Sequence, residues 1–148
     1  MGAGRVIVFG NAVYGHRIAQ RAGAIFNPAV DACIANAGPD GLWGGVIYSG
    51  FTGASIALHS ASFDPRWASI DMLWVTFHYP FMQLGCKKMF AQVPASNSKA
   101  LEFDRKLGFK EEARIADVFL DDDLLVLSML REDCRWLKLR PRTLKEPV

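Results

Sequence analysis

His59 is a residue that could transfer a proton, and it lies beside Ser60 and Ser62 in the segment ASIALHSAS. An imidazole group has an ordinary pKa of about 6.5, so a histidine can accept a proton near neutral pH. The apolar and β-branched content of residues 54–62 predicts a strand. We therefore interpret His59 as a candidate general base. A histidine whose hydrogen bonds are satisfied within the sheet is the alternative.

A second segment, VPASNSKALEFDRKLGF, predicts a helix over residues 96–107 that follows directly on a strand. Ser96 and Asn97 can each accept hydrogen bonds from backbone N–H groups that have no partner inside the helix. Gly108 suits the left-handed conformation that ends a helix, and Phe109 can pack back on the last turn. A plain capped helix would account for these residues, but not for the combination of strand, polar helix start and small Ala100.

The remaining patterns predict the elements that must position these residues. Strands are predicted at 5–10, 41–50, 54–62, 87–93, 111–120 and 124–130, with a turn at Asp121–Asp123. Helices are predicted at 11–23, over the segment NPAVDACIANAGPDG that starts at Asn27, and at about 67–84 with Pro80 inside the last turn. This order favours an α/β (α+β) fold with a mixed sheet covered by helices on both faces.

Composition excludes several classes of protein. The chain has 148 residues, 51% of them hydrophobic, which predicts one folded domain. A formal net charge of +2 is too small to argue for a nucleic-acid partner. The three cysteines and three histidines have no metal-ligand spacing, so we predict no metal site. With neither a secretion signal nor an apolar run of about 18 residues, we expect a cytoplasmic protein that does not enter membranes.

The element order and the second segment resemble the GNAT superfamily of N-acetyltransferases. The family motif is a strand, then Asn, two residues, Ala or Ser, and Gly-Phe eleven residues after the Asn; here it is Asn97, Ala100, Gly108 and Phe109. The resemblance is strongest to the branch that includes the ribosomal-protein acetyltransferases and, through DDDLLVLSMLREDCRWL, to small acetyltransferases of tailed bacteriophages. It covers about 43–137, and it implies a single GNAT-like domain at 1–137 with a mostly antiparallel sheet and a basic tail at 138–148.

The resemblance also implies a cofactor, acetyl coenzyme A. In the family, the motif asparagine faces the pantetheine arm, and a glycine-rich helix start binds the pyrophosphate through backbone N–H groups. In the matching segment DPRWASID the arginine is kept and both glycines are missing, and an ordinary helix start capped by Asp64 is the alternative. The implied cofactor-binding residues are Ala61, Ser62, Arg66, Trp67, Ala68, Ser69, Asn97, Ala100 and Phe103.

The reaction that the resemblance implies is direct attack of an amine on the acetyl group in a ternary complex. A backbone N–H at Ser60, Ala61 or Ser62 would hold the thioester carbonyl, and we take His59 and Ser60 as the catalytic residues. Asp64, Glu111 and Glu112 are the other candidate bases. Many members have a tyrosine acid seven residues after the asparagine, where this chain has Asp104, which we expect to be a solvated helix residue.

The expected function is therefore an acetyltransferase that acts on an amine of a protein or a small molecule. The alternative is a catalytically degenerate interaction protein, such as a phage factor that acts on a host protein; a phage origin would place the chain in the host cytoplasm. The missing glycines and tyrosine favour the alternative, and Arg66 and Asn97 favour the enzyme. Formation of a homodimer is left open.

Overall fold

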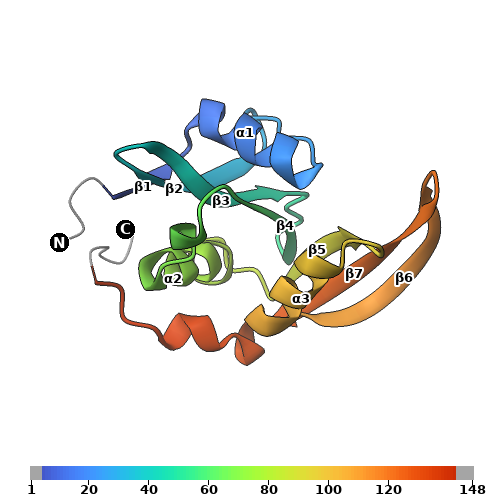
Figure 1. The fold of residues 1–148 in the computed structure, drawn as a ribbon. Coiled ribbons are helices and arrows are strands. Elements are labelled where there is room, and N and C mark those ends of the chain that lie inside the picture. Colours follow the sequence, from blue (N-terminus) through green and yellow to red (C-terminus); the bar gives the residue numbers. More distant parts are fainter. Residues whose placement is uncertain (1–4, 143–148) are drawn as a thin grey trace.

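Seven strands of the chain form one mixed sheet, as the computed structural model of residues 5–142 shows (Figure 1). In chain order the elements are β1 (Val6–Phe9), α1 (Ala12–Ala22), β2 (Ala32–Gly38), β3 (Gly41–Ser49), β4 (Ser55–Ser62), η1 (Pro65–Trp67), α2 (Ile70–His78), η2 (Tyr79–Gln83), β5 (Lys88–Pro94), α3 (Ser98–Leu107), β6 (Lys110–Phe119), β7 (Asp122–Leu130), η3 (Arg131–Asp133) and η4 (Arg135–Lys138).

The strand order in the sheet is β1-β2-β3-β4-β5-β7-β6. Every neighbouring pair is antiparallel except β4 and β5, which run parallel and are connected through α2. The predicted fold class, a mostly antiparallel mixed sheet with helices on both faces, is confirmed.

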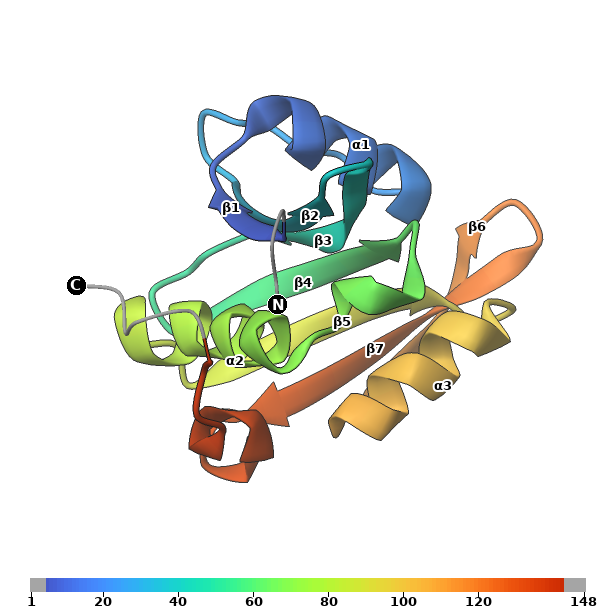
Figure 2. The ribbon, with the colours of Figure 1, turned by 60° about the vertical axis from the view of Figure 1, so that its left-hand side comes forward.

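Helices cover both faces of the sheet (Figure 2), and each face has its own apolar core. On one face α1 packs its buried Ile18 and Ala19 against β2, β3 and Ala61 of β4. On the other face α2 and α3 pack against a larger core that includes Leu58 of β4. Since side chains alternate along a strand, Leu58 and Ala61 show that β4 presents its odd-numbered residues to α1 and its even-numbered residues to α2 and α3.

The second predicted helix, from Asn27, is wrong, because residues 32–38 form the strand β2. β2 lies between β1 and β3, with Cys33 and Ala35 in the core under α1 and Ile34 in the opposite core. A strand covered on both faces has no polar alternation, so its sequence resembles that of a short buried helix. Its alanines, which are good helix formers, added to the error.

The predicted helix at 67–84 is shorter and less regular than expected. α2 begins after Ser69, whose side chain accepts a hydrogen bond from the N–H of Met72 over 3.2 Å, and ends at His78. The chain continues as a wide turn in which the N–H of Leu84 donates to the carbonyl of Tyr79 over 3.0 Å. Pro80 has no N–H to donate and clashes with the preceding turn of a regular helix, which explains the change.

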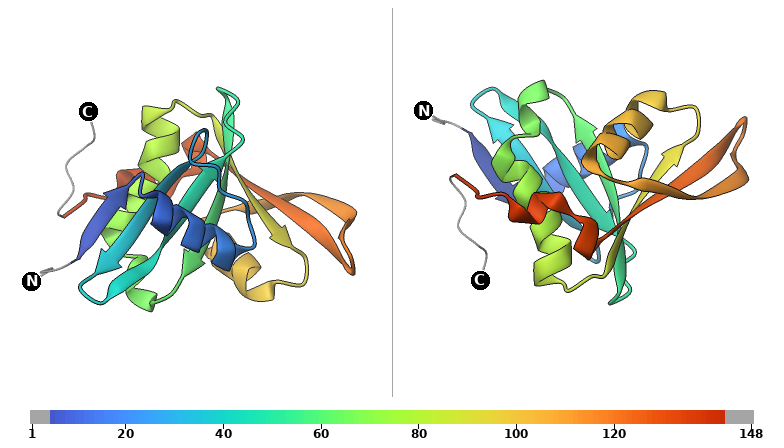
Figure 3. Two further views of the ribbon diagram at one scale, coloured as in Figure 1. Left: turned by 90° about the horizontal axis from the view of Figure 1, so that it is seen from above. Right: turned by 90° about the horizontal axis from the view of Figure 1, so that it is seen from below.

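The β6–β7 hairpin projects from the body of the molecule (Figures 1 and 3). Its turn is at Leu120 and Asp121, one residue earlier than predicted, and Asp122 and Asp123 belong to β7. Asp122 accepts hydrogen bonds from the N–H and the hydroxyl of Ser96, and Asp123 pairs with Arg114 over 2.9 Å.

The segment after β7 returns along α2. Leu139 packs against the larger core, and the N–H of Arg142 donates to the buried carboxylate of Asp71 in α2. The division into a domain at 1–137 and a tail at 138–148 stays a prediction, and the tail residues 143–148 lie outside the described residues. Within residues 5–142, no helix has the length and apolar character needed to cross a membrane.

Candidate active site

A gap opens in the sheet where β4 and β5 separate. Their pairing runs from Ser55 with Lys88 to Leu58 with Ala91, and both strands continue beyond that point without pairing to each other. A cavity of about 540 Å³ fills the gap. Its walls come from β4, β5, the η1 turn, α3 and the last turn of α1, so it reaches the edges of both helical layers.

The backbone of β4 directs two of its N–H groups into this gap. The N–H of Phe63 donates to the carbonyl of Trp43 in β3 over 2.8 Å, so position 63 faces β3. Backbone N–H groups alternate sides along a strand, so those of Ala61 and His59 also face β3, and those of Ser60 and Ser62 face the opening. Of the three predicted backbone donors, Ser60 and Ser62 agree with this geometry and Ala61 does not, and the catalytic role of Ser60 stays a prediction.

His59 lines the cavity from the face of the sheet that α1 covers. Burial lowers the pKa of His59 below 6.5, and the nearby carboxylate of Asp31 opposes that change in pKa. The imidazole is therefore mainly neutral at pH 7. A neutral imidazole is the form that can accept a proton.

The start of α3 contributes the predicted residues of the motif. Asn97 caps the helix by accepting a hydrogen bond from the N–H of Ala100 over 3.2 Å, and both residues line the cavity with Phe103. Ser96, the other predicted cap, instead bonds to Asp122 in β7. Gly108 ends the helix with a φ of +111°, as predicted.

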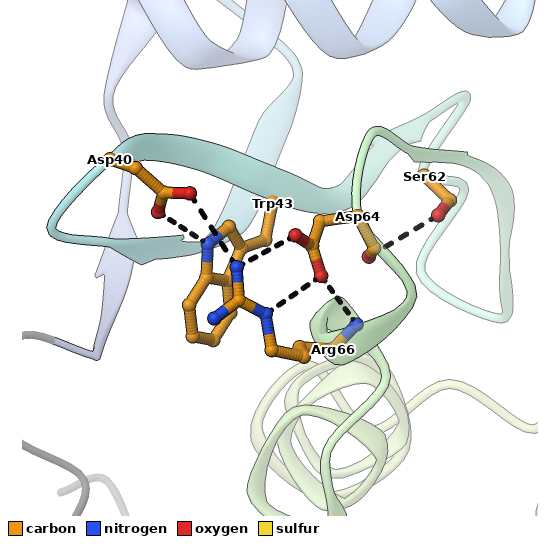
Figure 4. A network of polar contacts seen from close by, with 5 residues as sticks. All are labelled: Asp40, Trp43, Ser62, Asp64 and Arg66. Carbon is orange, nitrogen blue, oxygen red and sulfur yellow. Dashed lines mark hydrogen bonds and ion pairs between the residues drawn. The ribbon is translucent and has the colours of Figure 1, made fainter.

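Arg66 does not line the cavity but is held in a polar network (Figure 4). Its Nε and Nη2 donate to the two carboxylate oxygens of Asp64 over 2.9 and 2.7 Å, and Nη2 also lies 3.5 Å from Asp40. The guanidinium carbon lies 4.1 Å from the centre of the Trp43 ring. Hydrogen bonds from Arg66 lower the pKa of Asp64 to about 2. The side chain predicted to bind phosphate therefore has two carboxylate partners already.

The other residues of the predicted phosphate segment divide into two groups. Trp67 and Ala68 line the cavity, whereas Ser69 caps α2 and does not. The Trp67 ring is buried against Gly44 of β3, where a Cβ atom would lie 2.7 Å from the ring. The absence of a side chain at Gly44 thus makes room for the indole of Trp67. The centres of the Trp67 and Phe103 rings lie 5.9 Å apart.

Two cationic side chains of the cavity wall were not predicted as site residues from the sequence. Arg21 at the end of α1 and Lys99 in the first turn of α3 line the cavity, and neither makes an ion pair with the residues that the structure describes. Arg21 and Arg17 stand over the ring of Phe63, at 5.5 and 5.3 Å from its centre. Lys99 lies two residues from Asn97 in the motif, a position that could have indicated it; Arg21 carries no such signal.

Asp104 was expected to be solvated, and this is wrong: the residue is 7% exposed and lines the cavity. Burial raises the pKa of its carboxyl group to about 7. Leu101 and Leu107, three residues before and after it, are buried on the same face of α3. That spacing was visible in the sequence and could have indicated the burial.

The other candidate bases have different surroundings, and none of them lines the cavity. Asp64 caps the η1 turn and pairs with Arg66. Glu111 lies 3.8 Å from Arg105, and Glu112 pairs with Lys88 and accepts a hydrogen bond from Ser128. The structure thus brings together nine of the eleven predicted site residues, all but Arg66 and Ser69.

No model of a protein family matches the sequence, and no curated protein matches it. Solved structures of spermidine N-acetyltransferase from Vibrio cholerae are similar to the chain. The complex of that enzyme with CoA and spermine is 17% identical, with a TM-score of 0.60 over 70% of this chain and 68% of the other.

Two further structures are similar to the chain. The dodecameric structure of the Vibrio cholerae enzyme is 18% identical, with a TM-score of 0.59 over 70% of this chain and 66% of the other. A chimera of that enzyme and hSSAT is 13% identical, with a TM-score of 0.65 over 88% of this chain and 97% of the other. At these identities the similarity establishes the fold, which is that of N-acetyltransferases of the GNAT type.

Proposed function

We propose that the chain is an N-acetyltransferase that moves the acetyl group of acetyl coenzyme A to an amine. The observation that carries this proposal is the cavity between β4 and β5, which joins a neutral histidine, free backbone donors and the Asn97 helix start in one space. The fold supports the proposal, because it is shared with acetyltransferases, one of them solved with CoA.

The residues of the cavity fit such a cofactor in shape and in charge. The wall of α3 beside Asn97 and Ala100 offers a small side chain and a polar helix start for a narrow amide-containing arm. Arg21 and Lys99 in the cavity wall offer positive charge to phosphate groups. When bound, the cofactor would supply an acetyl group activated as a thioester.

Each catalytic role is assigned to a group of this chain. The N–H of Ser60 donates a hydrogen bond to an acyl oxygen in the gap, where negative charge develops during attack. His59 accepts the proton of the attacking amine. An α-amine, with an ordinary pKa of about 7.7–8.0, loses its proton more readily than a lysine at about 10.4, so the demand on His59 depends on the acceptor.

The acceptor is proposed only as a class, an amine of a protein or a small molecule. The relationship to ribosomal-protein and phage acetyltransferases rests on the sequence resemblance and remains a proposal. The cytoplasmic location and a homodimer also remain proposals. Spermine and a dodecamer belong to the Vibrio cholerae enzyme.

A second candidate function is a binding protein that has kept the fold and lost the chemistry. The engagement of Arg66 by Asp64 and Asp40 favours it, because the predicted phosphate ligand is not free. The test is release of free thiol from acetyl coenzyme A in the presence of a panel of α-amines, lysine peptides and polyamines. Amine-dependent release supports the enzyme. Cofactor binding without release from any amine supports the binding protein.

A further inference from the structure

Two arginines of α1 extend positive charge from the cavity to the surface of the molecule. Arg21 lines the cavity, and Arg17 lies four residues earlier on the same side of the helix. The guanidinium carbons of Arg17 and Arg21 lie 5.3 and 5.5 Å from the centre of the Phe63 ring, which is 38% exposed. We call Arg17, Arg21 and Phe63 the arginine cluster.

Neither guanidinium group of the cluster has a carboxylate partner within residues 5–142. Both side chains are exposed, and their guanidinium groups interact there only with the ring of Phe63. Like charges four residues apart on a helix repel each other, and α1 has no acidic residue to offset this repulsion. Attraction of each cation to the aromatic ring offsets part of it. Two guanidinium groups held side by side in this way suit a carboxylate or a phosphate, which each can bind through paired hydrogen bonds.

The cluster lies on the same face of the sheet as His59. Odd-numbered residues of β4 face the α1 layer, and the contact of Phe63 with α1 shows that its ring continues this face just beyond the strand. Asn97 and Lys99 belong to α3, which covers the opposite face (Figure 2). The residues proposed to hold the cofactor arm therefore lie on the α3 side of the cavity. An amine that gives its proton to His59 approaches from the α1 side, beside the cluster.

The carboxylates near the α1 side are engaged by other groups. Asp31, whose charge acts on His59, accepts a hydrogen bond from the N–H of Asn27 over 2.9 Å and does not line the cavity. Asp64, which follows the aromatic residue of the cluster in the chain, pairs with Arg66. Neither carboxylate neutralises the arginines of α1.

The wall of the cavity therefore has a positive net charge at neutral pH. Arg21 and Lys99 are both cationic, and the wall contains one carboxyl group within residues 5–142, that of Asp104. Burial raises the pKa of Asp104 to about 7, so this group is ionised in only part of the molecules. A polyamine, such as the spermine in the Vibrio cholerae complex, carries several positive charges and would be repelled by this wall. An acceptor with a negative group would be attracted.

We propose that the arginine cluster selects the acceptor, and that the acceptor is an amine that also carries a carboxylate or phosphate group. This inference rests on the proposed function and names the class of its substrate. The guanidinium groups of Arg17 and Arg21 bind the anionic group of the acceptor, and its amine extends into the cavity toward His59. Arg17 lies outside the cavity wall, so changing it separates recognition of the acceptor from binding of the cofactor.

The first test compares kcat/KM for three peptides with the same N-terminal residue. From the third position on, one carries glutamates, one carries phosphoserines and one carries glutamines, and spermine is the fourth substrate. We expect wild type to prefer both anionic peptides over the glutamine peptide by at least about tenfold, the contribution of a hydrogen bond to a charged group. Spermine should be the poorest substrate, and the preference should decrease as salt screens the charges.

Three variants assign this preference to the cluster. Arg17→Gln should lose most of it, mainly through a higher KM for the anionic peptides, with a much smaller change in the affinity for acetyl coenzyme A. Arg17→Lys should retain part of it, because lysine keeps the charge and loses the paired hydrogen bonds. Arg105→Gln removes the same charge from an exposed arginine of α3 that does not line the cavity, and should match wild type.

A second readout does not depend on turnover. Calorimetry measures the affinity of the glutamate and glutamine peptides for the protein in the presence of coenzyme A. We expect the glutamate peptide to bind at least about tenfold more tightly to wild type, and Arg17→Gln to remove most of that difference.

The outcomes separate this inference from the proposed function. Equal use of the three peptides, or preferred use of spermine, would overturn the inference and leave the acetyltransferase standing. Weaker binding of coenzyme A to Arg17→Gln with an unchanged preference among peptides would also overturn it, because the cluster would then bind the phosphates of the cofactor. Tighter binding of the glutamate peptide, lost in Arg17→Gln, without acetylation of any amine would support the cluster and contradict the proposed transfer. A protein that neither binds coenzyme A nor prefers anionic peptides would overturn both.

Discussion

Replacing Asp104 by asparagine should make the protein more stable at high pH and leave its stability at low pH nearly unchanged. The side chain is 7% exposed and has no side-chain partner within residues 5–142. Burial raises its pKa from 3.8 to about 7. In the unfolded chain the carboxyl group regains its ordinary pKa of about 3.9.

The sign of the effect follows from proton binding. Between about pH 4 and pH 7 the folded protein holds a proton on Asp104 that the unfolded chain has lost, so the free energy of unfolding falls as the pH rises through this range. Above about pH 7 both states are ionised and the loss is complete. A difference of about three pKa units corresponds to roughly 4 kcal/mol at about 1.36 kcal/mol per unit. That is a large part of the roughly 5–15 kcal/mol that stabilises a domain.

The assay is urea unfolding of wild type, Asp104→Asn and the control Glu102→Gln at about pH 4 and about pH 8. The free energy of unfolding of Asp104→Asn, relative to wild type, should increase by up to about 4 kcal/mol between the two pH values. The control should show little change. If the relative stability of Asp104→Asn is the same at both pH values, the carboxyl group is not held at a raised pKa and the reasoning fails.

Three further predictions concern the cavity. His59→Ala should reduce turnover by roughly 10²–10⁴-fold and remove the rise of turnover with pH that belongs to the imidazole, as a pH–rate profile would record; undiminished turnover would exclude His59 as the base. Asn97→Ala should lower the free energy of unfolding by about 1 kcal/mol for the lost cap and also weaken binding of acetyl coenzyme A, measured by calorimetry. If only the stability falls, Asn97 is a cap and nothing more. Lys99→Ala should weaken cofactor binding more than Arg66→Ala does, because Lys99 makes no ion pair within residues 5–142 and Arg66 is held by Asp64 and Asp40; the reverse order of affinities would restore Arg66 as the phosphate ligand.

The sequence predicted the fold well where the signals are local. α1 and α3 have side-chain caps at Asn11 and Asn97 and left-handed glycines at their ends, and these residue types mark helix boundaries by their own backbone chemistry. β2 was missed because its character depends on what covers it. Its alanines become strand residues only when β1, β3 and both helical layers surround them, and that is not a local property.

The candidate site was predictable in part for the same reason. The motif led to Asn97, Ala100 and the strand with His59, and these residues do meet in one cavity. The closer partner of Arg66, Asp64, lies only two residues away, but its second partner, Asp40, lies 26 residues away and comes close only through the turn before β3. The approach of Arg21 depends likewise on how α1 lies over the sheet. Contacts between such distant residues follow from the fold, and the local patterns of a single sequence do not predict them.

The most direct test of the central claim, that the gap between β4 and β5 binds the acetyl donor, is native mass spectrometry of the protein with coenzyme A, together with an Ala100→Trp variant. Ala100 lines the cavity near the exposed start of α3, so an indole there should fill the space, and circular dichroism would verify that the variant keeps its fold. We predict an adduct of one coenzyme A per chain for wild type and its loss in Ala100→Trp. Absence of an adduct in wild type, or an equally abundant adduct in the folded variant, would contradict the claim.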